Sequence, residues 1–209
     1  LPALSPDHTL LAVGGVEDGS VQVWPSGDEE LRYVLKGHTS VVVQALFSPD
    51  GSQIATASMD GTVRLWDAAE ATQQAVLEAH NGGVWAIGYS TDGNRLVSVG
   101  KDGLLKLWNP ADGSLLNTLE TGTGEWQVNS ISFVMGNSSV IIVSGCLYPL
   151  TCMAQGDGDI RSIDLNTGQV SVLLDKGALN LSSSADQSVF GFFDGGVQFG
   201  RIVSGNYQI

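Results

Sequence analysis

The feature that most constrains this chain is an internal repeat with a period of 42 residues. Three residue types keep that spacing, so the period does not depend on one chance match. The repeated positions are Asp18, Asp60 and Asp102, then Trp24, Trp66 and Trp108, and finally His38 and His80. Such a period predicts a chain built from similar units stacked beside one another.

Each unit is predicted to hold four short strands. The polar turn Ser48–Gly51 separates two alternating apolar stretches, and matching turns lie at Ser5–His8 and Ser90–Gly93. Asp112–Gly113 and Thr167–Gly168 turn the chain into a fourth strand. Strands after the first turns are expected at Ile54–Ser58, Val63–Asp67, Leu96–Gly100 and Leu104–Asn109. The 27 glycines and the charged fraction of only 15% also favour an all-β chain.

The motifs at these positions resemble the WD40-repeat family. The resemblance rests on Gly37-His38, Asp60-Gly61 and Leu65-Trp66-Asp67, and again on His80, Asp102-Gly103 and Leu107-Trp108-Asn109. Further along the chain the motifs weaken to Asp157-Gly158, Ile163-Asp164 and Asp194-Gly195, and the acidic, Gly-rich character resembles bacterial members of the family. The resemblance implies an all-β fold, a β-propeller of four-stranded antiparallel blades.

About five blades are predicted, in a single propeller domain over residues 1–209, at approximately 1–36, 37–78, 79–122, 123–176 and 177–209. Ala3–Asp7 matches Leu46–Asp50, so residue 1 already lies within a strand, and the last blade stops before it is finished. Propellers of this kind usually close with seven or eight blades. We therefore expect a piece of a longer ring, and a closed five-bladed ring is the competing hypothesis.

Thr56, His38 and Asp60 combine a hydroxyl, an imidazole and a carboxylate, which are the ingredients of a nucleophilic triad. Ser98, His80 and Asp102 repeat the same spacings one period later. An active site is seldom copied once per blade, whereas a folding device must be. By resemblance to the family, each set joins Trp66 or Trp108 in a buried hydrogen-bonded tetrad, and we expect no catalytic residues among them. In the first blade Gly14 occupies the hydroxyl position, so its set is incomplete.

The resemblance also implies where a partner would dock, because WD40 partners commonly contact one narrow face of the ring. Two groups of positions make up that face: those just after the His of each blade, and those before the turn Asp. In this chain they are Glu17, Val41, Val43, Met59, Trp85, Lys101, Gln127 and Asn129. Trp85 is the strongest candidate anchor. The alternative interpretation is that the apolar members pack between blades.

The sequence thus favours a non-catalytic scaffold that binds a protein or peptide, with no cofactor and no metal-ligand cluster. The alternative is a propeller-fold hydrolase or oxidoreductase whose site comes partly from blades outside this sequence. The net charge of −13 argues against nucleic acid as a partner. No apolar run approaches the roughly 18 to 20 residues that cross a bilayer, so we expect a soluble chain without membrane insertion.

Cys146 and Cys152 are the only cysteines, and they lie close together in one segment. They fit a disulfide that staples a short loop in an oxidising compartment, or two free thiols in a reducing one. A zinc site needs further ligands, and no His lies nearby. Location in the cytoplasm is slightly favoured, and export is the alternative if the two cysteines are bonded.

Overall fold

The computed structural model describes residues 2–14, 18–122, 127–134, 137–145, 159–175, 181–183, 189–193, 197–203 and 206–208. All regular elements in these ranges are β-strands. The described residues contain no helix of the length and apolarity needed to cross a membrane. The chain is therefore all-β, as its glycine content and alternating pattern predict.

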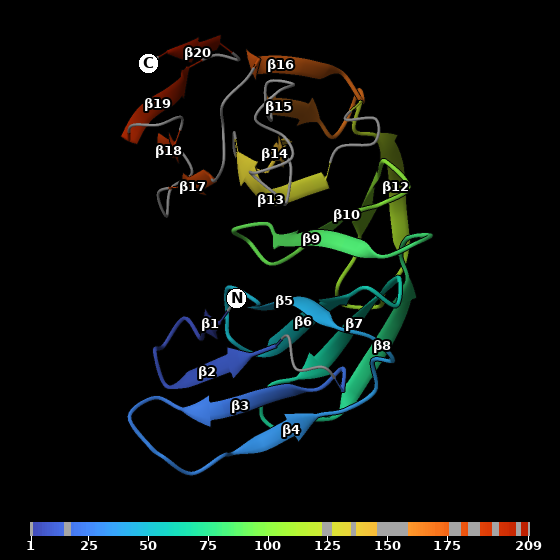
Figure 1. Cartoon of the computed structure of the whole chain (residues 1–209), viewed down its shortest axis with the longest axis vertical. Helices are drawn as coiled ribbons and strands as arrows, with labels where there is room; N and C mark the ends of the chain where they lie inside the picture. Colours follow the sequence, from blue (N-terminus) through green and yellow to red (C-terminus); the bar gives the residue numbers. More distant parts are fainter. Residues whose placement is uncertain are drawn as a thin grey trace. The chain divides into compact units, whose positions relative to one another are not determined.

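The strands form five antiparallel sheets of four strands each, in chain order (Figure 1). We number these sheets blades 1 to 5. Blade 1 holds β1 (Ala3–Leu4), β2 (Leu10–Val13), β3 (Val21–Pro25) and β4 (Tyr33–Leu35); blade 2 holds β5 (Val42–Phe47), β6 (Gln53–Ser58), β7 (Thr62–Asp67) and β8 (Gln73–Glu78). Blade 3 holds β9 (Val84–Tyr89), β10 (Leu96–Gly100), β11 (Leu104–Trp108) and β12 (Leu115–Glu120). Blade 4 holds β13 (Gln127–Val134), β14 (Ser139–Gly145), β15 (Asp159–Asp164) and β16 (Val170–Asp175), and blade 5 holds β17 (Leu181–Ser183), β18 (Val189–Phe193), β19 (Val197–Val203) and β20 (Asn206–Gln208).

This topology confirms the predicted blades of four antiparallel strands. The observed strands differ from the predicted ones by single residues, as at β6, which begins at Gln53, and β11, which ends at Trp108. The larger ring of seven or eight blades stays a prediction.

The hairpin turns between the first two strands of blades 1, 2 and 3 are held by one recurring hydrogen-bond pattern. In blade 2 the Ser48 hydroxyl donates to the Asp50 carboxylate at 2.6 Å, and the Ser52 amide donates to the same oxygen at 3.0 Å. The same serine-to-aspartate bond recurs in blades 1 and 3. A short polar side chain that satisfies the turn's own backbone explains why these sequences reverse the chain.

The chain divides into two compact units, residues 1–118 and 119–209. In the first unit the core lies between the blades. Trp66 of blade 2 belongs to one cluster with Ala12 and Val23 of blade 1, and Trp108 of blade 3 belongs to another with Leu65 of blade 2. Trp66 and Trp108 thus each share a core cluster with residues of the preceding blade. This packing makes β6 buried on both faces, whereas the outer strand β8 is largely exposed.

Candidate functional site

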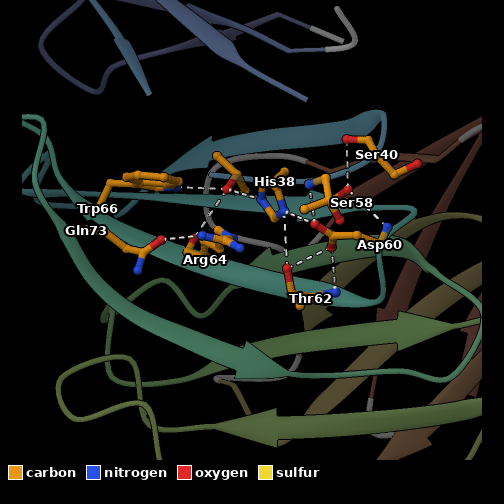
Figure 2. Close-up of polar contacts among 10 residues, drawn as sticks. His38, Ser40, Ser58, Asp60, Thr62, Arg64, Trp66 and Gln73 are labelled. Carbon is orange, nitrogen blue, oxygen red and sulfur yellow. Dashed lines mark hydrogen bonds and ion pairs between the residues drawn. The ribbon is translucent and has the colours of Figure 1, made fainter. Parts of the chain in front are cut away.

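Figure 2 shows a set of polar contacts in blade 2, with His38, Asp60 and Trp66 of the predicted tetrad among its labelled residues. The Trp66 indole N–H donates to Thr56 Oγ1 at 2.9 Å, and the same hydroxyl lies 2.8 Å from His38 Nε2. On the other side of the ring, His38 Nδ1 lies 2.9 Å from Asp60 Oδ2. One continuous chain of hydrogen bonds therefore joins β7, β6, the turn before β5 and the turn after β6.

The direction of each bond follows from the charge states. Burial opposes ionisation of Asp60, but hydrogen bonds from Thr39, Thr62 and His38 outweigh it and lower its pKa to about 2. An ionised carboxylate only accepts, so Nδ1 of His38 carries the proton. Burial also lowers the pKa of His38, against the opposing influence of Asp60, and favours the neutral ring. Nε2 then accepts from the Thr56 hydroxyl.

Thr62 joins this network although the repeat does not mark it. Its hydroxyl lies 2.7 Å from Asp60 Oδ1 and 3.1 Å from His38 Nδ1. The equivalent position in blade 3 is Leu104, which has no polar side chain. Blade 1 keeps a hydroxyl at this position, because Ser20 lies two residues after Asp18 and its side chain hydrogen-bonds to that carboxylate. A hydroxyl two positions after the turn aspartate, in blades 1 and 2, is the hint that the sequence offers.

Blade 3 repeats the arrangement with serine in place of threonine. Trp108 donates to Ser98 Oγ at 3.0 Å, which lies 2.8 Å from His80 Nε2, and His80 Nδ1 lies 2.9 Å from Asp102 Oδ1. Burial lowers the pKa of His80, with Asp102 acting in the opposite direction. The two sets therefore share one geometry despite the change of hydroxyl.

The predicted partner-binding face coincides with an irregularity in the strands that was not evident in the sequence. The β5–β6 pairing shifts register between Val42 and Gln44, which leaves Val43 as a bulge residue. The β9–β10 pairing shifts in the same way around Trp85, and the β13–β14 pairing shifts around Asn129. A β-bulge redirects a side chain and often lies next to a functional site. Three candidate residues thus occupy the same special backbone position, each in its own blade.

The other candidates in the first unit lie close to these bulges. Val41 is 40% exposed, and its carbonyl accepts a hydrogen bond from the Met59 amide at 2.9 Å. One period later, the Gly83 carbonyl accepts from the Lys101 amide at 3.0 Å. Trp85 and Met59 are half-buried, and Lys101 is exposed. Val43 packs against the core cluster shared by blades 2 and 3, so for this residue the inter-blade interpretation holds in part.

Comparison with known proteins identifies the repeat. A family model described as "WD domain, G-beta repeat" matches residues 3–25, 29–67 and 71–109. The chain contains WD40 repeats within residues 3–109. No curated protein matches it in sequence. Among solved structures, the WD40 chain is similar to a chain in the "Crystal Structure of Mitotic Checkpoint Complex", with 20% identity and a TM-score of 0.77.

That likeness covers 98% of the WD40 chain but 61% of the solved chain, so the WD40 chain spans about three fifths of the length of its structural neighbour. In all, 1728 solved chains are similar to it in fold. A fold shared so widely shows the architecture and leaves function to be argued from the site.

The tetrads of this WD40 protein have the residue types of a nucleophilic site without its accessibility. Thr56 and Ser98 are both fully buried. Each hydroxyl accepts from an indole N–H and donates its own proton to an imidazole, so its only donor is engaged within the fold. Within the described ranges no group of three or more His, Cys, Asp or Glu side chains is placed to hold a metal ion. A purely structural role for the tetrads stays a prediction, which stability measurements can test.

Some predicted site residues lie outside the described residues: Glu17, Cys146 and Cys152. The disulfide therefore stays a prediction. Gln127 and Asn129 lie on β13 in the second unit, where only their strand pairing is described.

Proposed function

We propose that this WD40 chain is a non-catalytic scaffold that binds a protein or peptide partner at the N-terminal ends of β5 and β9. In the first unit the contact residues would be Val41, Val43, Met59, Trp85 and Lys101. The observation that carries the proposal is the bulge at Trp85, because it places a large aromatic side chain, still partly exposed, at an irregular strand end.

The chemical character of these residues supports the same function. Partly exposed Trp and Met side chains act as anchors in protein interfaces, since they bury a large apolar area on binding. Val41 adds an exposed apolar contact on the neighbouring blade. Glu17, Gln127 and Asn129 hold the corresponding positions in blades 1 and 4, and the proposal extends to them by position alone.

The burial of the tetrad hydroxyls also fits a binding role better than a catalytic one. These hydroxyls are buried and hydrogen-bonded to the tetrad Trp and His, so the residues that most resemble catalytic groups are committed within the fold. No specific observation in the described residues favours the alternative of a propeller enzyme.

The proposal is tested by selecting binders from a phage-displayed library of random peptides on the full 209-residue chain. The selected peptides are then measured by calorimetry against Trp85→Ala and against Leu116→Ala. Leu116 is the matched control, because it is 52% exposed but lies on the outer strand β12. We expect Trp85→Ala to weaken binding at least tenfold, which is about 1.4 kcal/mol, and Leu116→Ala to leave it unchanged.

The melting temperature of Trp85→Ala distinguishes a binding role from a packing role. We expect it to stay close to that of the parent chain. A large loss of stability would indicate that Trp85 is a packing residue of the core. Peptides that bind Trp85→Ala as well as Leu116→Ala would contradict the proposed binding face.

A further inference from the structure

The connection between β8 and β9 contains two successive glycines, Gly82 and Gly83, at the seam between blades 2 and 3. Both have positive φ angles, +88° and +119°, which side-chain-bearing residues rarely adopt. The equivalent residues one blade earlier are Ser40 and Val41. Blade 3 therefore presents bare backbone where blade 2 presents side chains.

Two side chains lie against this bare backbone. A Cβ atom at Gly83 would lie 3.1 Å from Met59 Cε and 3.3 Å from its sulfur, so the Met59 thioether covers Gly83. A Cβ atom at Gly82 would lie 3.3 Å from Lys101 Cδ, so the alkyl part of Lys101 covers Gly82. Met59 comes from blade 2 and Lys101 from blade 3. The apolar Met59 side chain and the cationic Lys101 side chain thus lie against two adjacent glycines of one seam. The second of these glycines, Gly83, is two residues before Trp85.

Lys101 forms no direct ion pair within the part of the first unit that the structure describes. Lys101 is exposed, and the ion pairs found there do not include it. The neighbouring carboxylate of Asp102 already contacts His80 Nδ1 and accepts from the Asn81 amide. Asp60 is likewise engaged by His38, Thr39 and Thr62. Asp60 and Asp102 are therefore committed to the tetrads, and Glu78, which lines a hollow with Gly82 and Lys106, is a further acidic group at this seam.

We propose that this seam recognises a peptide segment in which a bulky apolar residue lies beside an Asp or Glu. The apolar side chain would contact Met59 and Trp85, and the carboxylate would pair with Lys101. This inference rests on the proposed function, because it names the chemistry of the partner at that same face. In a chain of net charge −13, a local cation beside an apolar surface gives an acidic segment one favourable place to bind.

The electrostatic part of this recognition is tested with the peptides selected on the full chain. Each peptide is measured by calorimetry against the parent, Lys101→Glu and Lys36→Glu, and a second copy is made with its acidic residue replaced by Lys. Lys36 is the matched control, because it is also exposed and its substitution changes the net charge equally, but its neighbour is Asp18 of blade 1. Melting temperatures verify that each variant folds.

We expect the selected peptides to share an acidic residue beside a bulky apolar one. Lys101→Glu should weaken the binding of these peptides at least tenfold, and Lys36→Glu should have little effect on it. The peptide whose acidic residue is replaced by Lys should bind Lys101→Glu better than the original peptide does. Peptides that need Trp85 but are basic, or that bind Lys101→Glu as well as the parent, would overturn this inference and leave the proposed function standing. If no selected peptide depends on Trp85, the proposed function fails, and this inference fails with it.

Discussion

The hydroxyl of Tyr89 on β9 donates a hydrogen bond to Gln53 Oε1 on β6 at 2.7 Å, which ties blade 3 directly to blade 2. The same Gln53 amide donates to Gln74 at 2.6 Å and to the Pro110 carbonyl at 3.3 Å. Burial raises the pKa of Tyr89, so its hydroxyl stays protonated and remains a donor. Gln53 is thus a junction between the two blades.

Tyr89→Phe removes this one bond and keeps the aromatic ring. We expect the free energy of unfolding to fall by about 1 kcal/mol, the usual net value of an intramolecular hydrogen bond. Urea denaturation of the variant beside the parent chain measures the difference. Equal midpoints and slopes would show that water replaces the bond without loss.

Asp60→Ala should destabilise the chain by about 1–3 kcal/mol, because it leaves the His38 ring and the Thr39 amide without their acceptor. Asp18→Ala is the matched control. Asp18 is the equivalent residue of blade 1, where Gly14 stands at the hydroxyl position, and its side chain is exposed. We expect a smaller effect there. Thermal melts that show equal losses for the two variants would contradict a role for the complete tetrad.

Gly61→Ala should be strongly destabilising. Gly61 has a φ of +90°, and a Cβ atom there would overlap the carbonyl oxygen of His80. Gly27→Ala separates the two causes, because Gly27 has a similar φ of +86° but no atom within 4 Å of its Cβ position. Gly27→Ala should lower the free energy of unfolding only by the strain of a left-handed backbone at Ala, about 1–2 kcal/mol. If chemical denaturation gives the same loss for both, the close approach of blades 2 and 3 is unimportant.

Stability should fall as the pH drops below about 6.5. Burial lowers the pKa of His38 and His80 from the usual 6.5, so the folded chain keeps both rings neutral while the unfolded chain takes up protons. Further loss should follow as the pH falls through the range from 3.8 to about 2, where Asp60 is protonated in the unfolded chain before the folded one. Most carboxylates titrate near pH 4, so the histidines dominate between about pH 7 and pH 5.

Calorimetric melting temperatures across that upper window test this expectation. His8→Asn is the control, because His8 is exposed in a hairpin turn and belongs to neither tetrad. A melting temperature that stays constant or rises from about pH 7 to pH 5 would contradict the assignment of neutral, buried imidazoles.

The sequence alone determined the strands and turns of the first blades and marked the residues that recur in blades 2 and 3. Their spacing placed Thr56 with His38 and Asp60, and the resemblance to the WD40 family added Trp66 to that set. The repeat did not single out Thr62, because blade 3 has Leu104 at that position and a hydroxyl recurs there only in blade 1, at Ser20.

Only the tertiary structure decided how the candidate binding residues are presented. The bulges at Val43 and Trp85 depend on the register between two strands, which the order of residues along one strand does not specify. The contact of Met59 with Gly83 and the hydrogen bond from Tyr89 to Gln53 join different blades. None of these four residues is among the Asp, Trp and His positions that define the repeat. Their partners are set by how one blade packs on the next, because the distances across a seam follow from packing and not from spacing along the chain.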